Sequence, residues 1–146
     1  QNREVPPLAY DRVYRLRATF PDLDVVLNGG VIGVQPALDH LAHVDGIMLG
    51  RAAYQNPWIL AGIGARLGHP VANTRREVIE LMVGYADKHI TNGGRLQQVA
   101  RHMLGLFHGQ PGARKWRQVL SQNMHLDGAE PELLLQACPE SELCAA

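Results

Sequence analysis

The chain contains 146 residues, of which 46% are hydrophobic and 19% are charged, and its 14 basic residues balance its 14 acidic residues. This apolar content supports a packed core and excludes a disordered polymer, while two cysteines near the C-terminus cannot hold a disulfide scaffold. No apolar run approaches the roughly 20 residues of a membrane span, and no secretory leader is recognisable. We therefore expect a cytoplasmic protein without a membrane partner. Because the chain begins with Gln1 and not Met, we expect a processed chain or a piece of a longer one.

The first half of the chain has the pattern of alternating helices and parallel strands. Apolar spacing predicts a helix at residues 10–20 and another at 35–43. Short apolar runs at 24–28 and 46–50 predict two buried strands, and glycine follows or ends each run. The order helix, strand, helix, strand is typical of a parallel α/β sheet.

The second half of the chain is predicted to be entirely helical. Thr74 and Glu77 fit a capping box that opens an amphipathic helix, which runs to Asn92. A second helix is expected from Leu96 to Gly109, a third after Pro111 and a fourth at 132–137. Apolar spacing places the side chain of Trp116 in the core, and Trp58 is expected to anchor a short helix after the second strand.

Two parallel strands cannot complete a fold of this class. An isolated pair is marginally stable, and an eight-stranded α/β barrel takes about 250 residues. The first half therefore indicates the end of a larger fold. The predicted organisation is an incomplete barrel at 1–62, a linker at 63–73, a helical domain at 74–126 and an acidic helix or tail at 127–146.

The glycines after the two strands predict a phosphate site. In parallel α/β folds ligands bind where strands end, because loops there expose main-chain amides. Glycine lets a phosphate approach those amides, and Arg51 beside Gly50 adds a cationic fork. The alternative interpretation is that Gly29 and Gly30 only make the turn into the next helix.

Charge is distributed unevenly along the chain. Residues 88–126 contain no Asp or Glu, and residues 127–146 contain no Lys or Arg. A basic block of this kind favours binding of a polyanion such as RNA, although a solvated helix face would look similar. The basic side chains of the block are Lys88, Arg95, Arg101, Arg114, Lys115 and Arg117.

Three segments resemble the tRNA-dihydrouridine synthases, specifically subfamily A. They are residues 27–31 (LNGGV), 43–58 (HVDGIMLGRAAYQNPW) and 101–118 (RHMLGLFHGQPGARKWRQ). The resemblance runs from about Asn2 to Leu126. It implies an α/β plus all-α architecture, namely the C-terminal part of a TIM (β/α)8 barrel followed by a helical-bundle domain that binds tRNA.

The resemblance also implies an activity. Enzymes of this family reduce the C5–C6 double bond of uridine, and subfamily A acts on positions 20 and 20a in the D-loop of tRNA, with FMN and NADPH as cofactors. A barrel cysteine that donates the proton belongs to a segment absent from these residues. The resemblance thus implies a fragment of a flavoenzyme that is inactive alone, with no catalytic residue of its own.

Site residues follow from the same resemblance. Asn28, Gly29 and Gly30 match one FMN-phosphate segment, and Gly50 with Arg51 match the second. The positions that match tRNA contacts are Arg3, Arg114 and Arg117, to which we add Arg101, a residue that either faces RNA or ties the helical domain to the barrel. The spacing of Arg114 and Arg117 places both on one helix face, opposite Trp116.

Other residues give weaker indications. His102 and His108 lie on different helix faces without a carboxylate or cysteine, so we expect no metal site. Cys138 and Cys144 have acidic neighbours that disfavour a thiolate. The functional alternatives are an RNA-binding module with a vestigial half-barrel, or another phosphate-binding barrel oxidoreductase. We expect a monomer.

Overall fold

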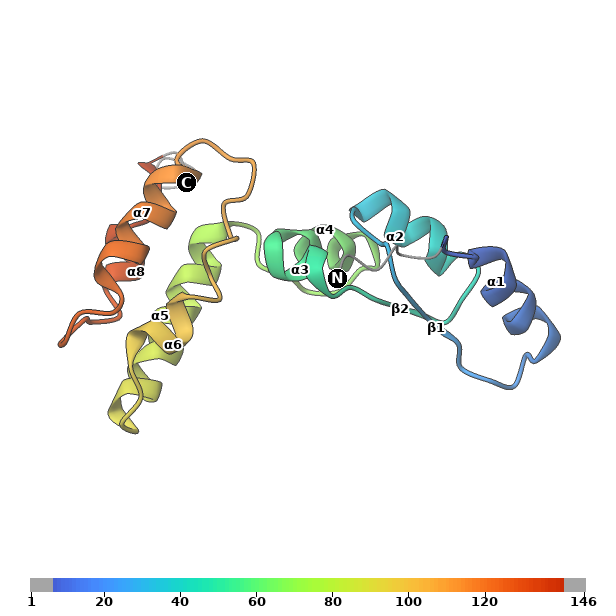
Figure 1. Cartoon of the computed structure of the whole chain (residues 1–146), viewed down its shortest axis with the longest axis horizontal. Helices are drawn as coiled ribbons and strands as arrows, with labels where there is room; N and C mark the ends of the chain where they lie inside the picture. Colours follow the sequence, from blue (N-terminus) through green and yellow to red (C-terminus); the bar gives the residue numbers. More distant parts are fainter. Residues whose placement is uncertain (1–6, 141–146) are drawn as a thin grey trace. The chain divides into compact units, whose positions relative to one another are not determined.

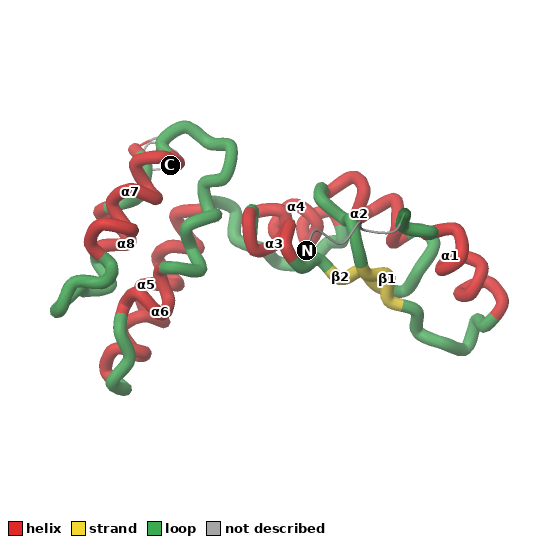
Figure 2. The backbone as a smooth tube through the Cα atoms, viewed as in Figure 1, coloured by secondary structure: helices red, strands yellow, loops and turns green. Residues whose placement is uncertain are grey.

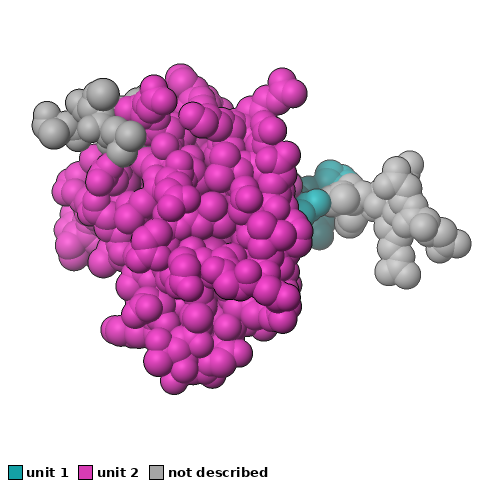
Figure 3. All heavy atoms as spheres, turned by 90° about the vertical axis from the view of Figure 1, so that its left-hand side faces the viewer, with its two compact units in different colours: residues 1–53 teal, residues 54–146 magenta. Residues whose placement is uncertain are grey.

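The computed structural model describes residues 7–140, and the chain divides into two compact units, Gln1–Ala53 and Tyr54–Ala146 (Figure 3). The first unit contains helix α1 (Tyr10–Thr19), strand β1 (Val26–Asn28), helix α2 (Val34–Leu41) and strand β2 (Gly46–Met48) (Figure 1). This order is the one that the sequence predicts. Each strand is shorter than the apolar run that predicts it.

The two strands form a parallel sheet, drawn in yellow in Figure 2. The register pairs Val26 with Gly46, Leu27 with Ile47 and Asn28 with Met48. Both strands therefore end at the same edge of the sheet. Because α2 connects them, this is a β–α–β crossover of the kind that builds α/β barrels.

Asp45 links the last turn of α1 to the beginnings of β1 and β2. Its Oδ2 atom accepts a hydrogen bond from the Val25 amide at 2.9 Å and lies 2.6 Å from the Arg17 guanidinium of α1. The amide hydrogen bond, followed by Arg17, lowers the pKa of Asp45 below its ordinary value of 3.8. One carboxylate thus fixes α1 and the entry to β1 to the entry of β2.

The prediction that both strands are buried is wrong for several of their side chains. Leu27 is buried, but Val26 is 60% exposed and Met48 is 46% exposed. Side chains alternate across a strand, so one face of β1 packs inward while the other has no cover within the described residues. A small parallel sheet with an uncovered face is consistent with part of a barrel.

The second unit is all-helical. Helix α3 (Arg51–Gln55) crosses the division between the units, and α4 (Trp58–Arg66) lies wholly in the second unit. The division between Ala53 and Tyr54 falls earlier in the chain than residues 63–73, which the sequence suggested as a linker. The remaining helices are α5 (Arg75–Thr91), α6 (Leu96–Ala100), α7 (Ala113–Asn123) and α8 (Leu133–Gln136).

Helix α5 begins where its sequence predicts. The Thr74 hydroxyl oxygen accepts a hydrogen bond from the Glu77 amide at 3.1 Å. The Glu77 carboxylate accepts from the amide of Asn73 at 2.7 Å, one residue before the position that a standard capping box uses. The prediction of a helix start is confirmed, with this shift in the second hydrogen bond.

The predicted helix from Leu96 to Gly109 is wrong beyond Ala100. Helix α6 ends there, and tight turns follow up to α7. A Cβ at Gly105 would overlap the Gln55 carbonyl oxygen and lie 3.1 Å from the Tyr54 carbonyl oxygen. The chain bends so that its main chain can pack against this segment, an interaction that apolar spacing alone cannot reveal.

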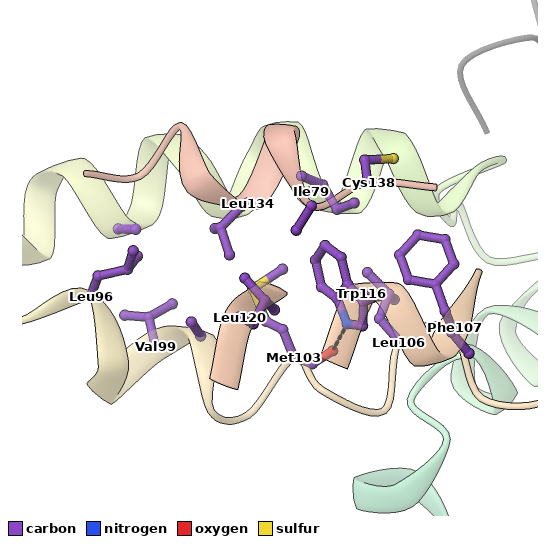
Figure 4. Packing of buried hydrophobic residues seen from close by; sticks show 14 residues of the cluster. Ile79, Leu96, Val99, Met103, Leu106, Phe107, Trp116, Leu120, Leu134 and Cys138 are labelled. Atoms are coloured by element: carbon purple, nitrogen blue, oxygen red, sulfur yellow. Dashed lines mark hydrogen bonds between the residues drawn. The ribbon is translucent and has the colours of Figure 1, made fainter. Parts of the chain in front are cut away.

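Trp116 lies at the centre of the helical core, fully buried, as the sequence predicts. Its Nε1 donates a hydrogen bond to the Met103 carbonyl oxygen at 3.0 Å, and its ring meets Phe107 edge-to-face at 5.0 Å (Figure 4). Around it lie buried side chains from α5, α6, the turns after α6 and α7 itself. They include Ile79, Ala86, Leu96, Val99, Met103, Leu106, Phe107 and Leu120.

The acidic segment also contributes to this core. Leu134, Ala137 and Cys138 are buried in the same cluster, and α8 packs against both α5 and α7. The sequence set 127–146 apart from the helical domain because its charges differ. In the described part of that segment the charged side chains face solvent, while its apolar side chains complete the core.

Candidate functional site

The first candidate site lies at the sheet edge where β1 and β2 end. Because Asn28 pairs with Met48, the turn Gly29–Gly30 and the turn Leu49–Gly50 leave from neighbouring positions. Asn28, Gly30 and Gly50 are exposed, and so is Arg51, the first residue of α3. The structure therefore brings together the five residues that the sequence assigned to a phosphate site.

The main chain of this edge is open to an anion. The Asn28–Met48 pairing directs the Gly29 amide toward the Met48 carbonyl as the end of the strand ladder, whereas no hydrogen bond within residues 7–140 engages the amides of Gly30 or Gly50. Gly29 and Gly30 have φ values of +115° and +68°, which side-chain-bearing residues rarely adopt. Main-chain amides that are left unpaired in such a turn can donate hydrogen bonds to a phosphate.

Arg51 supplies the charge at this edge. Its guanidinium is exposed and makes no ion pair or hydrogen bond within residues 7–140. A Cβ at Gly50, the residue before it, would approach only the Met48 sulfur at 3.9 Å, so the main chain there is uncrowded. A planar guanidinium beside unpaired main-chain N–H groups suits a dianionic phosphate.

Gly30 has a second reason to be glycine. A Cβ at this position would overlap the Tyr10 hydroxyl oxygen and lie 2.6 Å from Leu8 Cδ1. The Tyr10 hydroxyl donates a hydrogen bond to the Gly29 carbonyl oxygen at 2.9 Å. This packing against Tyr10 requires glycine at position 30 whether or not a phosphate binds. The alternative interpretation, in which the two glycines serve to make the turn, is therefore also supported.

The second candidate site is the exposed face of α7. Arg114 and Arg117 project into solvent, while Ala113, Trp116 and Leu120 are buried, so the predicted division of this helix into two faces is confirmed. Neither arginine has an interaction partner among residues 7–140. Two unpaired guanidinium groups one helical turn apart can form hydrogen bonds with successive phosphates of a nucleic-acid backbone.

Arg101 belongs to a small exposed network that the sequence did not reveal. Its Nε donates to His102 Nε2 at 3.0 Å, and His102 Nδ1 lies 3.2 Å from the Tyr54 hydroxyl oxygen. Arginine can only donate, so His102 Nε2 accepts and its ring proton is on Nδ1. The network holds an arginine and an exposed aromatic ring on one surface.

Arg75 is a half-buried cation that packs against aromatic side chains of the helical unit. Its guanidinium lies 4.5 Å from the centre of the Trp58 ring, and its Nε donates to the Leu106 carbonyl oxygen at 2.9 Å. These contacts fix α4 to α5 and to the turns after α6. Arg75 therefore stabilises the helical unit.

The remaining predictions concern Arg3, the two cysteines, metal binding and membrane spans. Arg3 and Cys144 lie outside the described residues. Cys138 is buried, which disfavours a role as a reactive thiol. Within residues 7–140 no group of three His, Cys, Asp or Glu side chains could hold a metal ion. None of the described helices is both long and apolar enough to cross a membrane.

A groove of about 360 Å³ lies elsewhere, between the end of α7 and α8. Its lining includes Asp127, Glu130 and Glu132. Carboxylates repel phosphate, so this groove does not belong to either candidate site.

Comparison with known proteins gives consistent results over nearly the whole chain. A family model described as "Dihydrouridine synthase (Dus)" matches residues 1–142. A protein of Shewanella oneidensis named tRNA-dihydrouridine(20/20a) synthase is 50% identical over 136 residues, covering 92% of this chain and 41% of that protein. Proteins with the same name from Xanthomonas axonopodis pv. citri and Vibrio vulnificus are 47% and 44% identical, covering 97% and 94% of this chain and 42% and 43% of their own lengths. The chain thus spans less than half the length of the curated relatives it matches.

Proposed function

Because the chain belongs to the dihydrouridine synthase family, we propose that it is the C-terminal portion of a tRNA-dihydrouridine synthase. The whole protein would reduce uridines 20 and 20a in the D-loop of tRNA, the positions in the names of its relatives. Its proposed cofactors are FMN and NADPH, and its proposed location is the cytoplasm. The first unit would be the end of the FMN-binding barrel and the helical unit the tRNA-binding domain.

The observation that carries this proposal is the parallel register of β1 and β2. It puts Gly29–Gly30 and Gly50–Arg51 at one sheet edge, with the Gly30 and Gly50 amides unpaired within the described residues and the Arg51 side chain exposed. These groups fit the phosphate of FMN, and Asn28 adds an exposed amide side chain. When bound, FMN supplies the hydride chemistry, while these residues bind and orient its phosphate.

The helical unit would bind the RNA. Arg114 and Arg117 are unpaired within the described residues and lie in the block from Lys88 to Leu126 that lacks acids. Arg101 and the exposed ring of Tyr54 offer a further surface with charge and an aromatic face. Arg3 remains a proposed tRNA contact outside the described residues. The family's proton-donating cysteine is proposed to lie outside these residues, since Cys138 is buried in the core.

Salt dependence tests the RNA part of the proposal. In the intact protein, Arg114→Ala and Arg117→Ala should each weaken tRNA binding by about 1–3 kcal/mol. Each should also reduce the slope of log affinity against log salt by about 0.7–0.9. Arg12→Ala is the matched control, because it removes an exposed arginine from α1, outside the basic block. Equal slopes in all variants would show that α7 does not contact phosphate.

Flavin titration tests the FMN-binding part of the proposal. Arg51→Ala in the intact protein should lower FMN affinity and leave tRNA affinity nearly unchanged, because the guanidinium stands beside the proposed phosphate position. Fluorescence quenching of the flavin measures this affinity. Losses of equal size for FMN and tRNA would assign Arg51 a structural role. If the intact protein bound tRNA but not FMN, the alternative of a non-catalytic RNA-binding module would be favoured.

A further inference from the structure

We infer that Tyr10 is a positioning residue for the phosphate site, which holds the Gly29–Gly30 turn in its anion-binding shape from the side opposite the ligand. This inference rests on the proposed FMN site. It adds a residue that neither the glycine pattern nor the resemblance to the family pointed to.

The first support is a direct hydrogen bond to the turn. Tyr10 is the first residue of α1, and its hydroxyl donates to the Gly29 carbonyl oxygen at 2.9 Å. The described peptide bonds are all trans, and in a trans peptide the carbonyl and the following N–H point in opposite directions. Because the Gly29 carbonyl faces Tyr10, the Gly30 N–H points away from Tyr10, where an anion can reach it.

The second support is the packing over Gly30. A Cβ on this residue would overlap the Tyr10 hydroxyl oxygen and come within 2.6 Å of Leu8 Cδ1. Tyr10 and Leu8 therefore fill the side of the turn on which a side chain would stand. A turn packed on one side has fewer conformations available, so its amides remain in place before the ligand binds.

The third support is that the Tyr10 ring is itself held in place. Its centre lies 4.4 Å from that of His40, near the end of α2. His40 Nδ1 lies 2.6 Å from the Tyr14 hydroxyl oxygen, and the Tyr14 ring packs on His43 at 4.5 Å. Tyr10 thus connects the turn after β1 with the far end of the helix that follows it.

Comparing FMN with riboflavin isolates this role, because the two flavins differ only in the phosphate. In the intact protein, Tyr10→Phe keeps the ring on His40 but removes the hydroxyl. We expect FMN affinity to fall roughly three- to tenfold, as for the loss of one neutral hydrogen bond, and riboflavin affinity to stay unchanged. Fluorescence titration of each flavin gives both affinities.

Tyr14→Phe is the matched control. It also removes a hydroxyl group that makes a hydrogen bond, but this hydroxyl contacts His40 and not the Gly29–Gly30 turn. We expect its ratio of FMN to riboflavin affinity to stay within twofold of the wild-type ratio. Leu8→Ala provides a second variant if Tyr10→Phe does not fold, since Leu8 is 48% exposed and its loss loosens the turn alone. The ratio should fall in this variant too.

The possible outcomes distinguish a failure of the role of Tyr10 from a failure of the proposed FMN site. A wild-type protein that binds FMN no better than riboflavin would overturn both the phosphate site and the role of Tyr10. A wild-type preference for FMN that persists fully in Tyr10→Phe and Leu8→Ala would overturn the role of Tyr10 alone. Equal losses for both flavins in Tyr10→Phe would also overturn it, because a general structural defect does not depend on the phosphate.

Discussion

Replacing Trp116 with phenylalanine removes the one polar group that the largest side chain of the helical core carries. Trp116 is fully buried, and its indole N–H is bonded to the Met103 carbonyl oxygen at 3.0 Å. Phenylalanine keeps an aromatic ring near Phe107 but cannot donate to that carbonyl. Met103 is itself buried and belongs to the turns that follow α6, so the substitution acts on the segment that connects α6 with α7.

The expected loss has two parts. Leaving a buried carbonyl without its donor costs about 1–3 kcal/mol. The smaller ring also leaves space beside Leu120 and Ile79, which are fully buried in the same cluster, at about 1 kcal/mol. The helical unit should therefore lose about 2–4 kcal/mol of its free energy of unfolding.

Amide hydrogen exchange of the intact protein measures this loss in the unit concerned. Peptides from α6 to α7 should exchange roughly 30-fold to 700-fold faster in Trp116→Phe, because each 1.4 kcal/mol corresponds to a factor of ten. Gln118→Ala is the matched control on the exposed face of α7 and should change exchange by less than about threefold. Acceleration below about fivefold in Trp116→Phe would refute the reasoning, because the carbonyl would then have found another donor.

Two further predictions concern the first unit. Gly30→Ala should lower its stability by about 2–4 kcal/mol in thermal unfolding of the intact protein, from the φ of +68° and the overlap with Tyr10. Gly50→Ala, which has neither problem, should stay within about 0.5 kcal/mol, and equal effects of the two would contradict this account. Asp45 should make stability depend on pH: its folded-state pKa is lowered by the Val25 amide and Arg17, so its contribution is present above the ordinary value of 3.8 and is lost as pH falls through the lower folded pKa. Between neutral pH and pH 3 the unfolding temperature of wild type should therefore fall more steeply than that of Asp45→Asn, and parallel curves would exclude this role.

Local patterns were sufficient to predict several features of this chain. The hydroxyl of Thr74 next to a suitable helix sequence predicted the start of α5, because a cap depends only on neighbouring residues. The period of α7 predicted that Trp116 is buried and that Arg114 and Arg117 are exposed. Glycine after each short apolar run predicted two turns that the parallel register then places at one edge.

Features that depend on residues distant in sequence could not be predicted. Helix α6 ends early because the chain near Gly105 packs against the main chain of Gln55. The core position of Leu134 was missed because its acidic neighbours dominate the composition of that segment. The outward position of Val26 was missed because a continuous apolar run does not indicate which face of a strand is covered.

Spacing within short stretches was enough to predict the order of helices and strands, the glycines of the two turns and the basic face of α7. Which of these residues contact one another depends on the folded chain. Folding brought Tyr10 against Gly29 across 19 positions of chain and joined Arg101, His102 and Tyr54 in one network. Such contacts depend on where the chain returns in space, and packing and hydrogen bonds between distant segments set that path.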